Sequence, residues 1–297
     1  MRILVARNHQ SIKGEPVHTY STSIVRVLRE KGHEVVDVPK STTQNYDGID
    51  LCLDIDCGRN DQGDLVWQAQ DGPLPCKSAV MFIDSHGYPS LHRRLAKSYD
   101  HVFFAVYDKR DLFVKHPSAY WCPNFSDLKW FDGDDYEMIP QPTDFGFFGT
   151  KGGLSRADAM EVIAMRRGWT ADIRQISVNG KHRWPQTAVA MSNCRTLFNK
   201  GQKHDSPNLR VMESMLMNRV LISDQDERSG MDLLFKAGGH YVPYEYFSFE
   251  GLEEAMEWCV ENPQAAAAMA REAYEEVKAN HLVGNRVDQI LEVVGNG

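Results

Sequence analysis

One carboxylate stands on an otherwise apolar helical stripe in the segment Asp205 to Asp224, DSPNLRVMESMLMNRVLISD. Glu213 follows Leu209 by four residues and precedes Leu216 by three, so these side chains share one face of a helix. Burying a carboxylate without a partner is costly, so Glu213 needs a partner if the stripe is buried. A solvated Glu at the edge of the buried stripe fits the same spacing. Both interpretations stay open at this point.

The helix that carries Glu213 has recognisable start and end signals. Ser206 can cap a helix, and Pro207 fits the first helical position, where a missing N–H costs nothing. At Asn218 the apolar helical pattern gives way to a short strand, Val220-Leu221-Ile222. The segment is therefore predicted to run from a loop through a helix into a strand.

The acidic residues of this segment carry a resemblance to a known family. Asp205 and Glu213, separated by seven residues, look like the acidic pair of GT-B glycosyltransferases. More closely, PNLRVMESM followed by VLISD resembles the C-terminal signature of the CgeB/YkvP-like glycosyltransferase family, near glycosyltransferase group 1. The resemblance implies that Glu213 holds the ribose hydroxyls of a sugar nucleotide. It also implies that the helix N-terminus, with free N–H groups and a positive dipole end, faces the diphosphate.

A second strand-to-helix junction has the composition of a phosphate-binding loop. The strand Phe145 to Phe148 leads into Gly149-Thr150-Lys151-Gly152-Gly153-Leu154-Ser155-Arg156, which holds three glycines and two cations. Such a loop lets backbone and charge approach a phosphate closely, although it is commonly just a turn. CgeB-like proteins carry a similar strand, glycine and arginine, so the resemblance places this loop at the donor. No Gly-Lys-Ser/Thr follows at the spacing of a Walker A loop.

A third loop, Asn199-Lys200-Gly201, follows the strand Thr196 to Phe198 and is expected beside Asp205. Without a metal, the charge on the leaving diphosphate must be stabilised by helix N-termini and cations such as Arg210. Each of these cations also suits a solvated surface position. The predicted donor-binding residues are Gly149, Thr150, Arg156, Asn199, Lys200, Asp205, Asn208, Arg210 and Glu213.

Acceptor chemistry is expected after the strand Lys77 to Ile83, which runs into Asp84-Ser85-His86-Gly87. Ligands of open α/β sheets bind beyond the carboxyl ends of the strands. His86 is suited to act as a base near neutral pH, and Asp84 can orient it, so both are catalytic candidates. Alternatively, Asp84 caps the next helix and His86 is a surface turn residue. A retaining enzyme would use the donor phosphate as base and need neither.

Strands and helices alternate from the first residues, which indicates an α/β fold. Met1 to Arg7, Val17 to Lys31 and Glu34 to Val38 form a strand, a helix and a strand of one βαβ unit. Pro140-Gln141-Pro142 marks a linker. The resemblance implies the GT-B class, two Rossmann-like domains facing across a cleft. The predicted parts are an acceptor-side domain at 1–140, a nucleotide-sugar-binding domain at 141–283 and a helix at 284–297 that packs back on the first domain.

The composition limits the remaining possibilities. The chain has 297 residues, is 42% hydrophobic and 25% charged, and contains no run of 18 apolar residues, so we expect a soluble cytoplasmic protein. The net charge of −8 argues against affinity based on broad phosphate neutralisation, though a local basic groove stays possible. Six scattered cysteines suggest no zinc site. One glycine in the first strand-to-helix loop argues against a nicotinamide cofactor.

The resemblance implies a metal-independent hexosyl- or pentosyltransferase. Its donor would be a nucleotide sugar, a UDP-sugar, and its acceptor a hydroxyl of a glycan, a protein or a modified nucleic acid. No cofactor and no metal are expected, and the Asp-x-Asp stretch Asp54-Ile55-Asp56 lies outside the donor domain. Alternatives are a non-catalytic sugar-nucleotide or glycan-binding protein, a transferase acting on hydroxymethylated DNA bases, and a GT-B epimerase or phosphorylase.

Overall fold

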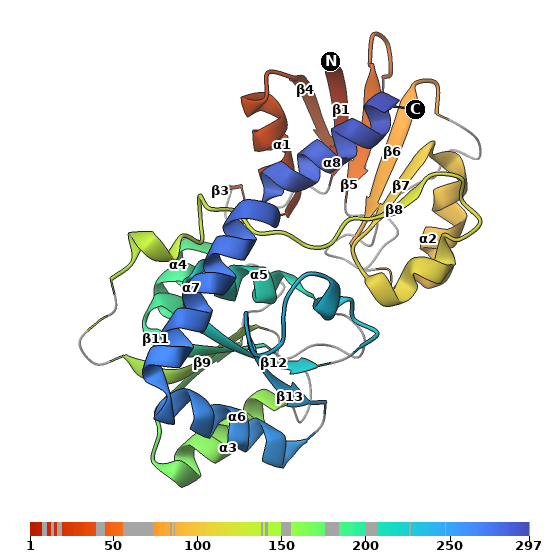
Figure 1. Ribbon diagram of the computed structural model, residues 1–297. Helices are drawn as coiled ribbons and strands as arrows, with labels where there is room; N and C mark the ends of the chain where they lie inside the picture. The colour runs from red at the N-terminus through yellow and green to blue at the C-terminus, as the bar shows by residue number, and fades with distance from the viewer. Residues whose placement is uncertain are drawn as a thin grey trace. The chain divides into compact units, whose positions relative to one another are not determined.

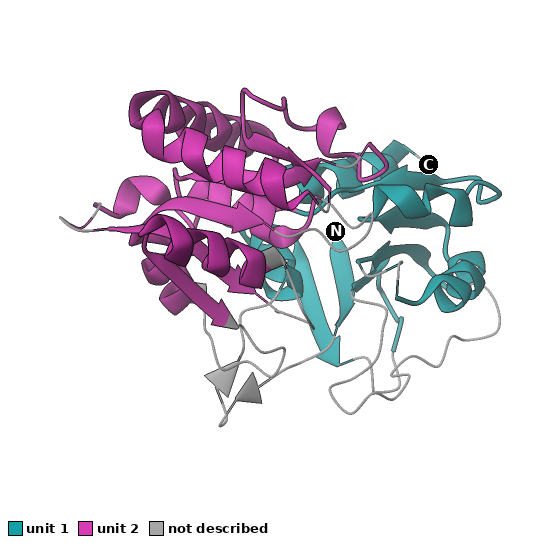
Figure 2. Cartoon of the chain, turned by 90° about the horizontal axis from the view of Figure 1, so that it is seen from below, with its two compact units in different colours: residues 1–124, 283–297 teal, residues 125–282 magenta. Residues whose placement is uncertain are grey.

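The computed structural model describes two compact units. The described residues are 1–7, 11–12, 15–16, 20–39, 45–55, 74–83, 85, 87–137, 139, 142–149, 156–175, 184–199, 207–225, 227–246 and 248–296. Unit 1 comprises Met1–Asn124 and Val283–Gly297, and unit 2 comprises Phe125–Leu282 (Figure 2). The sequence-based borders lie at 140/141 and 283/284, whereas the contacts of the chain change at 124/125 and 282/283.

Unit 1 is built on a six-stranded parallel sheet with the order β4-β1-β5-β6-β7-β8 (Figure 1). Its strands are β1 Arg2–Arg7, β4 Glu34–Pro39, β5 Leu51–Ile55, β6 Lys77–Phe82, β7 His101–Phe104 and β8 Ala119–Trp121, and a short hairpin is formed by β2 Ser11–Ile12 and β3 Glu15–Pro16. Its helices are α1 Tyr20–Glu30, α2 Pro89–Leu95, α8 Val283–Asn296 and the 3-10 helices η1 Ala96–Ser98 and η2 Tyr107–Leu112. The inner strand β5 is buried along its whole length, as expected where helices cover both faces of a parallel sheet.

The helix α8 packs on unit 1, against α1 and β7. Its Gln289 Nε2 donates a hydrogen bond to the carbonyl oxygen of Trp121 at 2.9 Å. Its buried Arg286 donates from Nε to the carbonyl oxygen of Pro123, also at 2.9 Å. These bonds satisfy backbone carbonyls at the end of the edge strand β8 and thereby hold that strand end in place.

Unit 2 is built on a five-stranded parallel sheet with the order β10-β9-β11-β12-β13. Its strands are β9 Thr143–Gly149, β10 Ala171–Gln175, β11 Cys194–Asn199, β12 Val220–Gln225 and β13 Val242–Glu245. Its helices are α3 Arg156–Arg167, α4 Trp184–Ser192, α5 Leu209–Leu216, α6 Phe249–Glu261, α7 Pro263–Asn280 and the 3-10 helices η3 Gly133–Asp135 and η4 Met231–Leu233. The parallel sheets of both units confirm the predicted α/β fold class.

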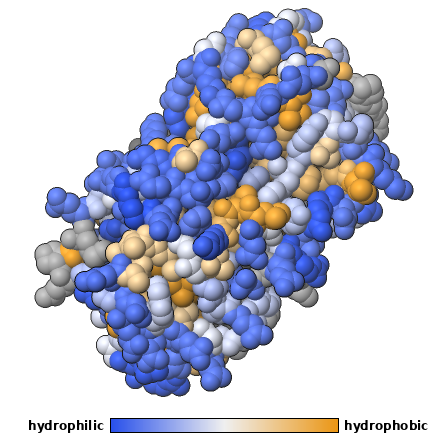
Figure 3. All heavy atoms as spheres, in the orientation of Figure 1, coloured by the Kyte–Doolittle hydropathy of each residue, from blue (hydrophilic) through white to orange (hydrophobic). Residues whose placement is uncertain are grey.

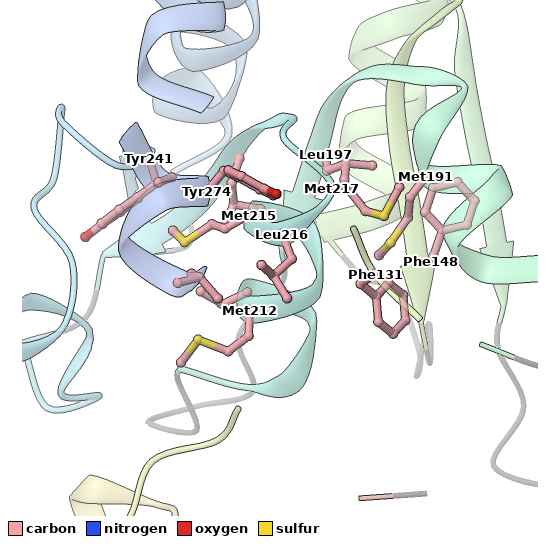
Figure 4. Close-up of a cluster of buried hydrophobic side chains, with 14 of the residues drawn as sticks. Phe131, Phe148, Met191, Leu197, Met212, Met215, Leu216, Met217, Tyr241 and Tyr274 are labelled. Atoms are coloured by element: carbon pink, nitrogen blue, oxygen red, sulfur yellow. The ribbon is translucent and has the colours of Figure 1, made fainter. Parts of the chain in front are cut away.

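Two apolar cores lie on the two faces of the sheet in unit 2. Phe145 and Phe147 of β9 belong to a core shared with α3 and α6, whereas Phe148 belongs to a core shared with α4 and α5. Successive residues of a strand point to opposite faces, which explains this division. Figure 4 shows Met212 and Met215 of α5 within the second core, where flexible thioether side chains fill irregular space. The helix α5 is thus fixed by packing.

The described surface gives no sign of a membrane span. On the face drawn in Figure 3, apolar residues form separate patches among hydrophilic ones. Within the described ranges, no helix is long and apolar enough to cross a bilayer.

The cysteines Cys52, Cys76, Cys122, Cys194 and Cys259 are free thiols, and burial raises the pKa of Cys122 and of Cys194 to about 12. These two thiols therefore stay protonated near neutral pH and serve as small core residues.

Candidate functional site

The first turn of α5 lies at the carboxyl ends of β9 and β11. Asn208 is the N-cap, because its side-chain oxygen accepts a hydrogen bond from the backbone N–H of Val211 at 3.3 Å. The prediction that Ser206 caps the helix and Pro207 starts it is therefore wrong, since the helix begins at Leu209. The physical reason is simple: Asn caps as well as Ser does, and this Asn stands two residues later.

Asn199 connects three elements around this turn. Its side chain is fully buried at the end of β11, and its Nδ2 donates to Ser223 Oγ on β12 at 3.0 Å. Its Oδ1 accepts from Asn208 Nδ2 at 3.0 Å and from Arg210 Nη1 at 3.2 Å. A buried amide with its oxygen and one N–H bonded in this way fixes the relative positions of β11, β12 and α5.

Arg210 fills the space beside the end of β9. Its Nε donates to the carbonyl oxygen of Phe148 at 2.8 Å, and its Cζ lies 4.7 Å from the centroid of the Phe147 ring. Burial lowers the pKa of Arg210, while Glu213 and Asp224 raise it. The guanidinium nevertheless stays charged, because even a lowered arginine pKa lies far above neutral.

Gly149 is required by this arrangement. A Cβ atom at position 149 would overlap the Arg210 guanidinium. Glycine at the end of β9 thus allows the charged group to approach the backbone closely. The structure therefore brings together Gly149, Asn199, Asn208 and Arg210 of the predicted donor residues.

Glu213 lies one turn further along α5 and is half-buried. Burial raises the pKa of its carboxyl to about 7, and the positive charge of Arg210 opposes that rise. Within the described part of the chain, no side chain donates a hydrogen bond to this carboxylate. A carboxylate in such a setting is an acceptor for the hydroxyl groups of a ligand.

A cavity of about 500 Å³ opens beside the same strand end. The Phe148 ring forms one wall, and Pro185, Thr187 and Val189 of α4 line another. Arg174 of β10 also lines the cavity, with its Cζ 5.9 Å from the centroid of the Phe148 ring. Mostly apolar walls with a few polar groups are typical of small-molecule sites. Nothing in the sequence pattern pointed to this cavity, because β10 and α4 meet only in the folded chain.

Several predicted residues fall outside the described structure. These are the catalytic candidates Asp84 and His86 and the donor candidates Thr150, Lys200 and Asp205. Arg156 is the first residue of α3, but its side chain is likewise outside the description. The catalytic and donor-binding roles predicted for these residues stay predictions.

The structure adds a buried polar pair at the predicted acceptor edge of unit 1. Ser85, which lies between the two catalytic candidates, is fully buried, and its Oγ is 3.1 Å from Nδ1 of the buried His92. The His92 ring stacks on Phe82 of β6 with centroids 4.3 Å apart. The sequence gave one usable signal for this pair, a Ser three residues after a buried strand and a His in the first turn of the next helix, α2.

Metal ligands are not grouped in the residues that the structure describes, since no three His, Cys, Asp or Glu side chains converge there. Asp54, from the Asp-x-Asp stretch, is fully buried and accepts a hydrogen bond from the Tyr99 hydroxyl. In this arrangement Asp54 serves the packing of β5 against the segment that follows α2.

Comparison with known proteins decides the family. The family model described as glycosyl transferase-like matches residues 144–292, which is half of the chain. The chain belongs to this family. The match covers the donor candidates of unit 2, from Gly149 to Glu213. A sequence search of curated proteins found no match.

Solved structures of glycosyltransferases share the fold over the whole chain. Sucrose-phosphate synthase from Thermosynechococcus elongatus aligns with a TM-score of 0.67 and 10% identity, over 100% of this chain and 98% of that one. HepE from Anabaena, in complex with UDP-glucose, gives 0.61 and 12%, over 100% of both chains. An alpha-glucosyltransferase in complex with UDP and a 13-mer DNA gives 0.64 and 12%, over 99% of both chains. These likenesses show a GT-B fold in this glycosyltransferase family member.

Proposed function

We propose that this chain transfers a glycosyl group from a nucleotide sugar, a UDP-sugar, to an acceptor hydroxyl. The observation that carries the proposal is the cluster at the start of α5. There a buried guanidinium is held by Phe148 and Asn199, and the carboxylate of Glu213 lies three residues along the helix. The nucleotide complexes of the two structural neighbours support the choice of donor. The CgeB/YkvP-like resemblance is part of this proposal.

Each part of the cluster has a role in the proposed donor site. Glu213 accepts hydrogen bonds from the ribose hydroxyls, and the cavity beside Phe148 takes the base. The N-terminal turn of α5 and Arg210 supply positive charge toward the diphosphate as it leaves, and such preorganised groups are usually the largest catalytic contribution. In the transfer, the acceptor oxygen replaces the diphosphate at the anomeric carbon. Its proton passes to the leaving diphosphate or to a base, for which His86 and Asp84 are proposed.

The proposed reaction needs no metal, because the cations of unit 2 stabilise the diphosphate. Turnover of a UDP-sugar should therefore survive EDTA. Loss of turnover in EDTA that manganese or magnesium restores would overturn this part of the proposal.

The donor proposal is tested by a thermal-shift screen with a panel of sugar nucleotides. A ligand at 100 times its dissociation constant adds about 2.7 kcal/mol to the free energy of unfolding. Glu213→Ala should remove most of the shift given by the best ligand, because a hydrogen bond to a charged group contributes roughly 1.5–3 kcal/mol. Glu257→Ala, at a part-exposed carboxylate that pairs with Arg167, is the matched control. The same shift in Glu213→Ala and in the parent protein would exclude Glu213 from the site.

A further inference from the structure

The cavity beside Phe148 has one charged side chain among its described lining residues, which are Phe148, Arg174, Pro185, Gln186, Thr187, Val189 and Ala190. An arginine side chain carries N–H donors and no acceptor. The amide of Gln186 and the hydroxyl of Thr187, in contrast, can each donate or accept. Within this lining, Arg174 is therefore the side chain that can distinguish an oxygen acceptor from an N–H donor on a ligand.

Strand pairing places Arg174 on the cavity side of the sheet. Arg174 of β10 lies opposite Phe148 of β9 in the parallel register. Residues opposite each other on neighbouring strands share a face of the sheet, and the Phe148 face is the one whose core includes Ala188 and Ala190 of α4. The guanidinium thus stands beside the Phe148 ring, with its Cζ 5.9 Å from the ring centroid.

An ion pair within β10 fixes this guanidinium. Nε of Arg174 donates to Asp172 Oδ1 at 2.9 Å, and Nη2 donates to Asp172 Oδ2 at 2.7 Å. A bidentate pair fixes the plane of the guanidinium as well as its position. Nη1 takes no part in the pair and has no acceptor among the residues that the structure describes. Its N–H groups are thus free to bond a ligand.

Helix α4 gives the cavity the same polarity. Pro185, Gln186 and Thr187, which line the cavity, belong to its N-terminal turn. The N-terminal end of a helix carries a partial positive charge. The helix end and Arg174 therefore both favour a ligand oxygen over a ligand N–H.

The cavity and the Arg210 cluster share one residue, Phe148. Its ring lines the cavity, while its carbonyl oxygen accepts the hydrogen bond from Arg210 Nε at 2.8 Å. Gly149, whose missing Cβ makes room for Arg210, comes next in the chain. The base end and the diphosphate end of the proposed donor site thus meet at Phe148.

We propose that Arg174 selects nucleotides whose base presents a carbonyl oxygen, namely those of uracil, thymine and guanine. Cytosine and adenine carry an amino group at the corresponding position. An amino group that faces the guanidinium brings two donors together and leaves both without an acceptor, which costs affinity. This inference rests on the proposed function, because it takes the cavity to be the place where the base of the donor binds.

A contact between Arg174 and the diphosphate fits the structure less well. The carboxylate of Asp172 lies against the guanidinium, so the pair as a whole is neutral. A neutral pair attracts a phosphate group less than a lone cation does. Its remaining N–H groups still bond the carbonyl oxygen of an uncharged base.

The test is isothermal titration calorimetry of the full chain with UDP and CDP at one pH and one salt concentration. The two nucleotides carry the same ribose and diphosphate, so a difference in affinity reports on the base alone. UDP should bind about tenfold or more tightly than CDP, because the hydrogen bond comes from a charged donor. GDP and ADP form a second pair, in which GDP should bind more tightly. The preference is taken from the pair that binds more tightly.

The variant Arg174→Gln should remove the preference. Because the amide can turn its oxygen or its nitrogen toward the base, UDP and CDP should then bind within about threefold of each other. The matched control is Arg195→Gln, at another exposed arginine of unit 2 that pairs with a carboxylate, Asp144 at 3.3 Å. This control should keep the full preference.

The base preference and the donor site can fail separately. Equal affinity of the parent protein for the two nucleotides of the pair, or an unchanged preference in Arg174→Gln, would overturn the proposal and leave the donor site standing. A fall of UDP and CDP affinity by the same factor in Arg174→Gln would indicate a phosphate or ribose contact and would also overturn it. If none of the four nucleotides binds, the proposed function fails together with the base preference.

Discussion

The carboxyl-terminal sheet edges of the two units use charge in opposite ways. In unit 2, Arg210 is enclosed and bonded to Phe148 and Asn199, so its position is fixed before any ligand arrives. In unit 1, Arg110 of η2 is exposed, and its Cζ lies 4.4 Å from the centroid of the Tyr107 ring. An enclosed guanidinium suits a small ligand that must be held in one geometry. An exposed charge is screened by water and salt, so it holds a ligand less firmly than an enclosed charge does.

The largest expected effect concerns chemistry at the edge of unit 1. If His86 is the base for the acceptor, His86→Ala should lower turnover about 10²- to 10⁴-fold, the usual cost of losing a general base. Affinity for the sugar nucleotide should hardly change, because the donor candidates lie in unit 2. The measurement is turnover and nucleotide affinity in parallel, with His33→Ala as a control in the same unit. A loss of only a few-fold would favour a retaining mechanism in which the donor phosphate takes the proton.

The sequence predicts where the donor candidates lie better than it predicts their bonds. The apolar stripe places Arg210 and Glu213 on one helix, and the family resemblance makes them donor candidates with Asn208, although the helix begins two residues later than the sequence suggested. Asn199 follows from its place after a buried strand. That Arg210 bonds to Phe148 could not be predicted, because a backbone carbonyl 62 residues away has no signature in sequence. Such partners are decided by which strands become neighbours in the sheet.

The pairing of individual charges is hidden in the sequence for a different reason. A net charge of −8 averages over the whole chain, and it argued against a phosphate-rich partner. Pairing decides whether a charge is available, and pairing appears only in the folded structure. Arg2 is neutralised by Glu34, while Arg110 stands over Tyr107 without a carboxylate in the described residues. Composition therefore gives the sum of the charges but not where they remain uncompensated.

A smaller effect is expected from loosening the enclosed guanidinium. Arg210→Lys keeps the charge but loses the fork that reaches both Phe148 and Asn199, so sugar-nucleotide affinity should fall about tenfold or more. Gly149→Ala should act in the same direction, because the new Cβ overlaps the guanidinium while Arg210 itself is retained. Isothermal titration calorimetry measures the sugar-nucleotide affinity of both variants.

The matched control for the glycine is Gly295→Ala, where nothing lies within 4 Å of the added Cβ. Equal donor affinity in Gly149→Ala and Gly295→Ala would mean that the close approach of Arg210 to the backbone is not needed for binding.

The smallest effect is a pH dependence of sugar-nucleotide affinity, which we expect to arise from unit 2 alone. The pKa of the Glu213 carboxyl is raised to about 7 by burial, so the fraction of carboxylate increases from about a tenth at pH 6 to about nine tenths at pH 8. Because the carboxylate is the proposed acceptor of ribose hydroxyls, affinity for a UDP-sugar should rise about tenfold over this range. A nucleotide sugar is the right probe, because its diphosphate is esterified at both ends and does not titrate between pH 6 and pH 8. Glu213→Gln should bind more weakly and show no such rise.

The same carboxyl should give the ligand-free protein a pH dependence of the opposite sign. Its pKa is about 7 in the folded chain and about 4.5 in the unfolded one, so the folded state binds the extra proton between these values. The contribution to the free energy of unfolding is therefore fully present below about pH 4.5 and lost as pH rises through about 7. Urea unfolding of the parent protein, compared with Glu213→Gln at each pH, measures it. If UDP-sugar affinity rises with pH and the free energy of unfolding falls with pH, and both trends vanish in Glu213→Gln, the Glu213 carboxyl is the cause of both. A rise in affinity that persists in Glu213→Gln would instead place the titrating group elsewhere and remove the argument for a ribose contact at Glu213.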